Sequence, residues 1–379
     1  MTISTDEKER QALYFLMSTE LFSNNTLRKL RNTYGSYEQI CKAGTDLKKH
    51  IKENAFDKLA YALERTDREY LYSRLKKHST GFYMFEDDMY PKRFRELHDA
   101  PCAILVKGRL PSETIPSVAV IGARKCSNFG SSMTEEYVSV ISGSGIQVIS
   151  GMAMGIDSIA GTCALKNDGP SFAVLGNGPD ICYPAHNRPL YDELVKKGGI
   201  ISEYTLGSSG VSWHFPQRNR LISALCDAVI VIEAKEKSGT MITVDAALEQ
   251  GKDVYALPGR SCDLLSRGCN MLIKQGAGIL ISPEEFICDL FTQISHKCEY
   301  DDFIKSFSKK SEPKPSIELT EKEKVVFKNL DHLPKGVDEI LSMVSAKEKI
   351  SIADLLITLN SLAIKGLVTN ISGTYFAIK

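Results

Sequence analysis

Between residues 117 and 282 the sequence alternates short apolar runs with longer stretches of helical spacing. The runs are continuously apolar, which is typical of parallel strands that helices cover on both faces. We therefore predict an α/β fold with a Rossmann-like, doubly wound, mostly parallel sheet. The predicted strands are Val118–Ile121, Gln147–Ser150, Phe172–Leu175, Ile200–Glu203, Ala228–Glu233, Val254–Leu257 and Ile279–Ile281. Two shorter strands, near Phe82–Phe85 and Ala103–Val106, are expected before them.

Two further units flank this sheet. Residues 1–80 place leucines at helical spacing among charges of both signs, which indicates a small helical bundle. Residues 316–379 read as three helices and a hairpin, the element order of a winged helix. The polar segment KKSEPKPS precedes them as a linker. We therefore divide the chain into a helical domain (1–80), an α/β domain (81–291), a linker (292–315) and a winged-helix domain (316–379).

The last predicted helix of the C-terminal unit, Ile352–Ala363, is mostly apolar, and Lys365 is the one basic residue beside it. Reading of the DNA major groove needs polar and basic side chains that face the bases. A DNA reader and a protein-interaction wing both fit the element order. The apolar helix disfavours major-groove reading.

Charge narrows the function classes. Lys+Arg and Asp+Glu both number 47, so the formal net charge is zero and no global basic field exists. Binding of a polyanion must therefore depend on a local cluster of arginines and lysines.

The ten cysteines form no CxxC pair, which favours reduced thiols and no metal site. The N-terminus lacks the pattern of a signal peptide. No apolar run approaches the roughly 18 residues of a membrane span. We expect a soluble cytoplasmic protein that does not bind a membrane.

Glycine-containing turns follow the first three strands of the α/β pattern. In open α/β sheets, ligands bind beyond the carboxyl ends of the strands, so these turns face one site. Gly122 lets the backbone approach a ligand, and the helix that starts at Ser127 offers amide donors to a phosphate. Arg124 adds a cation with bidentate geometry. The next glycine comes eight residues after Gly122, which does not fit the dinucleotide pattern GxGxxG.

The second turn contains Gly151 and Gly155 and is followed by Asp157. We expect Asp157 either to complement the start of a helix or to orient Arg124. The third turn leads to Asn187 and Arg188, which again suits a phosphate.

An aromatic and basic cluster precedes the strand that begins at Ala228. Trp213, His214 and Phe215 are available for base stacking, worth about 1–3 kcal/mol per base. Core packing is the alternative for Trp213 and Phe215. Arg218 and Arg220, with Arg124 and Arg188, are expected to contact phosphates. No Ser–His–Asp order, paired catalytic carboxylates or P-loop is present, so we expect neither an enzyme nor a cofactor.

These motifs, in this order, resemble those of the bacterial DNA-processing protein A family, DprA or Smf. The motifs that carry the resemblance are Gly122-Ala-Arg124 with Gly130, SGMAMGID (150–157), Tyr183-Pro184 with Asn187-Arg188, Phe215-Pro216-Gln-Arg218-Asn219-Arg220, Ser238-Gly239-Thr240 with ALEQG (247–251), Pro258-Gly259 and GCNMLIKQGA (268–277). They cover residues 80–290, and the flanking units match by architecture.

The resemblance implies a dimeric, cytoplasmic protein that binds single-stranded DNA during natural transformation. Such proteins protect incoming strands, displace or bypass single-strand-binding protein and help to load a RecA-type recombinase. They bind DNA in a basic pocket without chemistry. The resemblance further implies that the N-terminal unit is a SAM-like domain. The expected DNA-binding residues are Gly122, Arg124, Lys125, Ser127, Gly151, Gly155, Asn187, Arg188, Trp213, Phe215, Arg218, Asn219, Arg220, Ser238, Gly239, Thr240 and Lys274.

Two positions depart from the family pattern. The family often has Lys or Arg just after the Tyr-Pro pair, where this sequence has Ala185-His186, and we expect Arg188 to substitute. Many members have a basic residue before the His-Phe-Pro, where Ser212-Trp213 stand here. We therefore expect weaker or more stacking-dependent binding.

Two other function classes compete with DNA binding. Rossmann-like nucleoside monophosphate phosphoribohydrolases share the glycine turns but carry a Pro-Gly-Gly-x-Gly-Thr-x-x-Glu motif. Here only Ser238-Gly239-Thr240 appears, and Val244 stands where the glutamate would fall. A winged-helix transcription regulator with a ligand-sensing core is the third interpretation, and the apolar recognition helix argues against it.

Overall fold

The computed structural model describes residues 5–295, 297, 300–301, 303, 319–330, 335–345, 350–371 and 375–378. Two compact units divide the chain, Met1–Ser306 and Phe307–Lys379.

The first unit is built on a nine-stranded sheet of order β1-β2-β6-β5-β4-β3-β7-β8-β9. Neighbouring strands from β6 to β9 in this order are parallel, whereas β2 pairs antiparallel with both β1 and β6. The strands are β1 Gly81–Met84, β2 Ala103–Gly108, β3 Ser117–Ile121, β4 Gln147–Ser150, β5 Ser171–Leu175, β6 Gly199–Ser202, β7 Ala228–Val231, β8 Asp253–Ala256 and β9 Gly278–Ile279. The predicted α/β fold with a mostly parallel, Rossmann-like sheet is confirmed.

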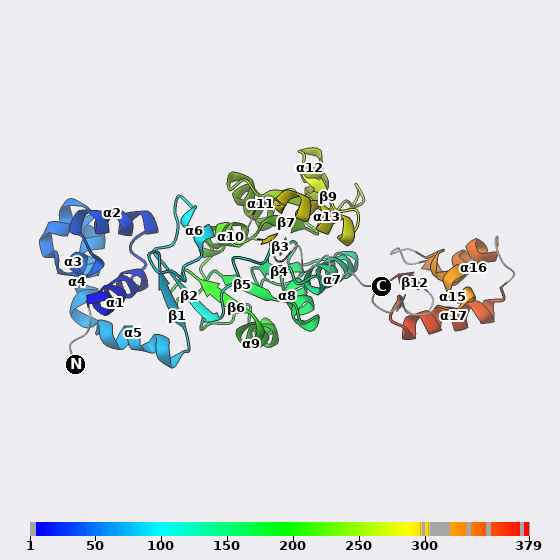
Figure 1. Ribbon diagram of the computed structural model, residues 1–379, viewed down its shortest axis with the longest axis horizontal. Helices are drawn as coiled ribbons and strands as arrows, with labels where there is room; N and C mark the ends of the chain where they lie inside the picture. Colours follow the sequence, from blue (N-terminus) through cyan, green and yellow to red (C-terminus); the bar gives the residue numbers. More distant parts are fainter. Residues whose placement is uncertain are drawn as a thin grey trace. The chain divides into compact units, whose positions relative to one another are not determined.

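Helices cover both faces of this sheet. The chain runs from β3 outward to β6 and then returns to the other side of β3 as β7, so the strand order reverses between β3 and β7. Helix α7 packs against α8 and α13, and α10 packs against α11; Figure 1 shows α8 and α9 on one side of the strands and α10 and α11 on the other. The helices are α6 Lys92–Arg95, α7 Asn128–Gly143, α8 Ile156–Lys166, η2 Ala185–Asn187, α9 Arg188–Lys197, α10 His214–Ala224, α11 Gly239–Glu249, α12 Arg267–Lys274 and α13 Pro283–Ile294.

The two helical layers explain the apolar runs of the sequence. Every residue of β3, β4, β5, β6 and β7 is buried. A strand that is covered on both faces needs apolar residues at successive positions.

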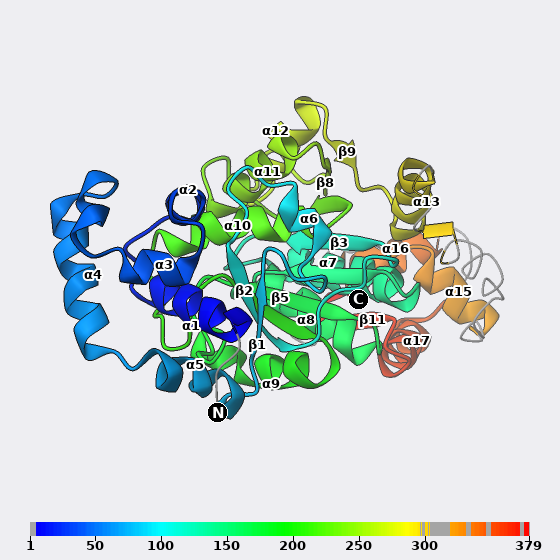
Figure 2. The ribbon, with the colours of Figure 1, turned by 60° about the vertical axis from the view of Figure 1, so that its left-hand side comes forward.

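The N-terminal residues form α1 Thr5–Ser18, α2 Asn24–Tyr34, α3 Tyr37–Lys42, the 3₁₀ helix η1 Gly44–Lys49, α4 Glu53–Arg65 and α5 Arg68–Lys77. Leu13, Leu16, Leu27 and Leu30 are buried, which confirms the predicted helical spacing. These helices share one hydrophobic core with β1 and β2 and lie beside those strands (Figure 2). A boundary at residue 80 therefore stays a prediction.

The α/β unit continues beyond the predicted start of the linker. Helix α13 ends at Ile294, and the buried Tyr300 hydroxyl contacts both carboxylate oxygens of Asp227 at 3.0 Å. The segment KKSEPKPS lies outside the described residues.

The second unit contains α15 Glu321–Phe327, α16 Val337–Ser345 and α17 Ile352–Ile364, with β10 Lys335–Gly336, β11 Val368–Ile371 and β12 Tyr375–Ile378. The three strands form a sheet of order β10-β12-β11. Three helices and a β11–β12 hairpin follow one another as the sequence predicts. Lys365, the basic residue beside α17, pairs with Glu323 at 2.7 Å.

Candidate nucleic-acid interface

Most of the predicted site residues meet at the carboxyl edge of the parallel sheet. The turns after β3, β4, β5 and β7 lie there, as does the start of α10 after β6. This edge contains the point between β3 and β7 where the strand order reverses, the place where open α/β sheets bind ligands. The predicted residues at this edge are Gly122, Arg124, Lys125, Ser127, Gly151, Gly155, Asn187, Arg188, Trp213, Phe215, Arg218, Asn219, Arg220, Ser238, Gly239 and Thr240.

Lys274 is the exception. It belongs to the last turn of α12, which leads into the amino end of β9. The adjacent Gln275 lines a hollow with Lys252 and Asp253, at the start of β8. Lys274 therefore lies at the opposite end of the strands from the glycine turns.

Phe215 is the centre of a cationic and aromatic group. The Arg124 guanidinium carbon lies 5.9 Å from the Phe215 ring centroid. The exposed ring of Tyr183 lies on the same side chain, with centroids 5.4 Å apart. Gly176 makes room for the Phe215 ring, because a Cβ there would come within 3.0 Å of it.

Arg124 and Lys125 are exposed, and within the described part of the chain neither forms a salt bridge. They are therefore available to an anionic ligand. The turn thus presents two exposed cations, one of which, Arg124, lies beside the Phe215 ring, an arrangement suited to a nucleotide's phosphate and base.

Trp213 is 52% exposed and packs edge-on against His214 at 4.1 Å between centroids. Core packing is thus not its role in this structure. His214 is buried, stacks on Tyr204 at 3.8 Å and contacts the Gly176 carbonyl through Nδ1 at 3.1 Å. Burial lowers the pKa of His214. The exposed indole of Trp213 therefore packs on a neutral, buried imidazole.

Ser127 differs from the expectation that it offers its donors to a phosphate. Its amide donates to Glu233 at 2.9 Å and its hydroxyl to the same carboxylate at 2.5 Å. The hydroxyl also accepts from the Gly130 amide at 3.0 Å and caps α7. Glu233 is 3% exposed, so a buried carboxylate already occupies the donors that sequence reasoning reserved for a ligand.

Arg218 also differs from the expectation of an exposed phosphate contact. Its side chain is buried and donates to the carbonyls of Gly151, at 3.0 Å, and Val174. Burial lowers the pKa of Arg218 to about 10, so the guanidinium remains protonated at neutral pH. Gly151 lies against both Arg218 and Asp157, and its amide donates to the Asp157 carboxylate at 3.0 Å. Arg218 thus joins the turn after β4 to strand β5.

Arg220 forms internal ion pairs. Its guanidinium lies 2.8 Å from Asp99 and 2.7 Å from Glu203, and its side chain is 14% exposed. Burial raises the pKa of Glu203, and Arg220 opposes that shift. Arg220 therefore fixes α10 to β6 and to the segment before β2, and its role as a DNA contact stays a prediction.

The remaining polar residues brace the turns. Asn187 donates to the Met152 carbonyl at 2.9 Å, Asn219 to the Gly239 carbonyl at 3.4 Å and Thr240 to the Gly122 carbonyl at 3.2 Å. Arg188 is exposed and pairs with Asp192 one turn along α9, at 2.9 Å. Of the four predicted arginines, Arg124 and Arg188 thus keep solvent-facing guanidinium groups.

Two glycines of the site differ sharply in what they tolerate. Gly155 has φ +74°, and a Cβ there would lie 2.2 Å from the Ala123 carbonyl oxygen. Only glycine fits where the turns after β3 and β4 approach each other so closely. A Cβ on Gly239, at the start of α11, would meet no atom within 4 Å. Gly239 is exposed, and the side of its backbone where a Cβ would lie is open, while its carbonyl accepts from Asn219.

Sequence reasoning missed four contributors to this edge. Tyr183 was noted in a motif but not assigned to the site, and Glu233 was noted only as the end of a strand. Lys235 and Lys237 are exposed in the turn after β7. A signal existed for the lysines, because they follow a predicted strand that ends at the site.

The described residues contain no group of three or more His, Cys, Asp or Glu side chains that could hold a metal. None of the described helices is long and apolar enough to cross a membrane.

Comparison with known proteins places this arrangement in context. The model of the family described as DNA recombination-mediator protein A matches residues 81–291. The DNA processing protein DprA of Streptococcus pneumoniae is 41% identical over 203 residues, which are 54% of this chain and 72% of that protein. Protein Smf of Escherichia coli is 37% identical over 206 residues, 54% of this chain and 55% of that protein.

Two solved structures are similar to parts of this chain. The X-ray structure of DNA processing protein A from Streptococcus pneumoniae matches with a TM-score of 0.65 and 33% identity, covering 76% of this chain and 98% of that one. The structure of DNA processing protein A from Helicobacter pylori, described for its single-stranded DNA binding mode, matches with a TM-score of 0.51 and 29% identity. It covers 56% of this chain and 96% of that one.

Proposed function

Since the chain belongs to the DNA recombination-mediator protein A family, we propose that it is a mediator that binds single-stranded DNA at the carboxyl edge of its parallel sheet. The Helicobacter pylori relative binds single-stranded DNA. The matched segment of the present chain contains all of the turns that form this edge.

The observation that carries the proposal is the position of Phe215 between Arg124 and Tyr183. A single strand offers bases that stack on aromatic rings and phosphates that attract cations. A duplex hides the faces of its bases in the helical stack, so an aromatic surface gains less from it. Exposed Trp213 adds a further stacking surface, and Lys125, Lys235 and Lys237 add cations.

Four residues act indirectly in this proposal. Ser127, Arg218, Asn219 and Arg220 hold the turns in place through partners within the protein. Binding then proceeds without covalent chemistry, and the protein is a mediator and not an enzyme.

The finer role follows the family. The protein protects incoming single strands during natural transformation, acts as a homodimer in the cytoplasm, and helps to load a RecA-type recombinase onto strands covered by single-strand-binding protein.

Fluorescence anisotropy with labelled oligo-dT and with the corresponding duplex tests the binding. We expect tight binding to oligo-dT, weak binding to the duplex and a steep loss of affinity with salt. Equal affinity for both, or no binding to oligo-dT at low salt, would contradict the proposal.

Recombinase loading needs a separate assay. A RecA-type ATPase is measured on single strands that are saturated with single-strand-binding protein. We expect the protein to shorten the lag before ATP hydrolysis. An unchanged lag, with oligo-dT binding intact, would overturn the loading role and leave the binding site standing.

A further inference from the structure

A second cationic surface lies at the amino end of the parallel strands, opposite the candidate interface. Its centre is a pocket of about 340 Å³ that is lined by Arg109, Asp168, Gly169, Lys196 and Lys197. Arg109 follows β2, Asp168 and Gly169 precede β5, and the two lysines end α9 just before β6. Because β2 runs antiparallel to β6, its carboxyl end meets the amino ends of β5 and β6.

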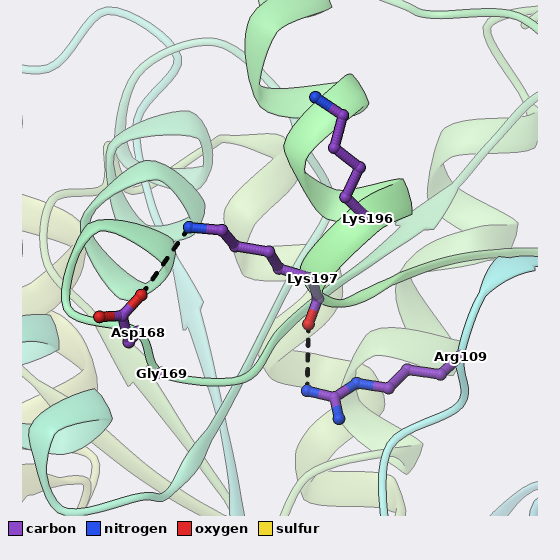
Figure 3. A pocket seen from close by; sticks show the side chains of 5 residues that line it. All are labelled: Arg109, Asp168, Gly169, Lys196 and Lys197. Carbon is purple, nitrogen blue, oxygen red and sulfur yellow. Dashed lines mark hydrogen bonds and ion pairs between the residues drawn. The ribbon is translucent and has the colours of Figure 1, made fainter.

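The side chains of this pocket come from three separate segments. Arg109 donates to the Lys197 carbonyl at 3.0 Å, and the Lys197 ammonium lies 3.8 Å from Asp168. Figure 3 shows Lys196 pointing away from this pair, along α9. The lysine is thus directed back toward the start of the helix, where Arg188 stands.

Helix α9 connects this pocket to the candidate interface. Its ten residues span about 15 Å at 1.5 Å per residue, from Arg188 to Lys197. Tyr191 lies between, with the Arg188 guanidinium carbon 5.2 Å and the Lys107 ammonium 5.8 Å from its ring centroid. Five cations therefore follow the flank formed by α9 and β2, and we name them the α9 cation row: Arg188, Lys107, Arg109, Lys196 and Lys197.

The carboxylates beside the row do not neutralise it. Asp192 pairs with Arg188, Glu193 with both Lys196 and Lys197, and Asp168 with Lys197. These three carboxylates pair with three of the five cations, and Asp180 is a fourth carboxylate near Tyr191. Arg188, Lys196 and Lys197 have side chains that are 62%, 68% and 52% exposed, so their ion pairs are screened and weak. The phosphates of a polyanion can displace these carboxylates from the cations, and the counterions bound to the polyanion are then released.

The negative end of the α9 dipole accounts for lysines in the last turn of the helix. The same end of the helix also attracts Arg109, whose guanidinium donates to the Lys197 carbonyl, but it does not account for Lys107 on β2. The observation to be explained is that basic residues from α9 and from β2 and its end converge in an otherwise neutral chain.

We propose that the α9 cation row binds the phosphates of single-stranded DNA that extends beyond the candidate interface, so that one strand contacts both ends of the sheet. The inference rests on the proposed function and specifies the path of the strand. A short strand fills the carboxyl edge alone. A longer strand continues from Arg188 along α9 to the pocket at Arg109 and Lys197.

The test compares two oligo-dT lengths with one triple variant, Arg109→Gln/Lys196→Gln/Lys197→Gln. Wild type and variant are titrated with oligo-dT of about 6 and about 30 nucleotides across a salt series. For the long strand, loss of three phosphate contacts lowers the slope of log K against log salt by about 2, at roughly 0.7 per contact. The ratio of wild-type affinity to variant affinity then falls about 20-fold between 50 and 200 mM salt. The short strand keeps wild-type affinity and slope.

Two controls guard the interpretation. Lys48→Gln/Lys49→Gln/Lys52→Gln removes the same charge from exposed lysines near η1 and leaves both slopes unchanged. Glu193→Gln frees Lys196 and Lys197, and it strengthens long-strand binding without loss of a basic residue. The gain from Glu193→Gln cannot come from misfolding.

If the triple variant keeps the wild-type slope of log K against log salt for the long strand, the α9 cation row does not bind DNA and the proposal is wrong. Equal losses for both lengths would also overturn it, because the effect would then be general charge. Absence of binding by wild type to either length would instead refute the proposed function itself.

Discussion

Ser127 and Glu233 join the carboxyl ends of β3 and β7, where the strand order of the sheet reverses. The serine hydroxyl donates to the glutamate carboxylate at 2.5 Å, and the serine amide donates to it at 2.9 Å. The same hydroxyl caps α7 by accepting from Gly130. This contact holds the turn that presents Arg124 and Lys125 to solvent, so the geometry of the exposed cations depends on a carboxylate that is itself buried.

Replacement of Glu233 tests this dependence. Glu233→Gln removes a charged acceptor from two donors and places an amide group against them. We expect the free energy of unfolding to fall by about 1–3 kcal/mol, as for a buried hydrogen bond left unsatisfied, and oligo-dT affinity to fall with it. Urea unfolding and anisotropy measure the two effects. Glu236→Gln, an exposed position in the same turn, is the control that should change neither. Wild-type stability in Glu233→Gln would show that the contact is dispensable.

Gly155 and Gly239 make a matched pair of test positions, because a Cβ would clash at Gly155 and would meet open space at Gly239. Gly155→Ala forces a Cβ to within 2.2 Å of the Ala123 carbonyl oxygen at φ +74°, and we expect a loss of stability of about 1–3 kcal/mol. Gly239→Ala meets no atom within 4 Å, so stability should stay within about 0.5 kcal/mol of wild type. Because Gly239 is exposed at the candidate interface, an added methyl group should obstruct the strand, so oligo-dT affinity should fall in this variant while the fold is kept. Equal unfolding curves for the two variants would contradict the assigned packing.

Trp213 should matter for binding and not for folding. Trp213→Ala removes an exposed stacking surface, and we expect oligo-dT affinity to weaken by about 1–3 kcal/mol, the usual value for one base stack. Trp213→Phe should retain most of the affinity. Tyr61→Ala, which removes an aromatic side chain of similar exposure from α4, is the control and should bind as wild type does. Unchanged affinity in Trp213→Ala would remove Trp213 from the interface.

His214 should make stability depend on pH. Burial lowers the pKa of the folded imidazole below its ordinary value of about 6.5, although Glu20 acts in the opposite direction. Below pH 6.5 the unfolded chain therefore binds a proton that the folded chain does not, and stability falls as the pH is lowered further toward the folded pKa. Above pH 6.5 neither state is protonated, and this effect disappears.

Urea unfolding at pH 7.5 and 5.5 measures the effect. The drop in unfolding free energy should be smaller in His214→Phe than in wild type, whereas His98→Phe, at an exposed position, should keep the wild-type drop. An identical drop in His214→Phe would mean that other groups cause the pH dependence.

The strands of the sheet were predictable because burial on both faces requires a continuous apolar run in each strand. The strand from Gln147 to Ser150 was placed to the residue, and the others to within one or two. The antiparallel pairing of β2 with β6 was not predictable, since the partners are about a hundred residues apart and local sequence contains no pairing signal. The N-terminal helices also share their core with β1 and β2, which spacing within the helices could not reveal.

The site was predictable as a location and less so as a set of contacts. Glycine turns at strand ends placed the edge correctly, because topology brings those ends together. The contacts of two arginines involve residues that are distant in the sequence. Arg218 donates to the Gly151 and Val174 carbonyls, and Arg220 pairs with Asp99 and Glu203. The sequence identifies an arginine as a cation. Whether its guanidinium donates to a carbonyl, pairs with a carboxylate or faces solvent depends on the tertiary structure.

The most direct test of the account is oligo-dT binding by Arg124→Ala across a salt series. Arg124 is exposed, forms no salt bridge within the described residues and lies over Phe215, so its loss should weaken binding and lower the salt slope by about 0.7, the contribution of one phosphate contact. Arg65→Ala, an exposed arginine on α4, should match wild type. If Arg124→Ala binds oligo-dT with wild-type affinity and wild-type slope, the single strand does not bind at the carboxyl edge of the sheet.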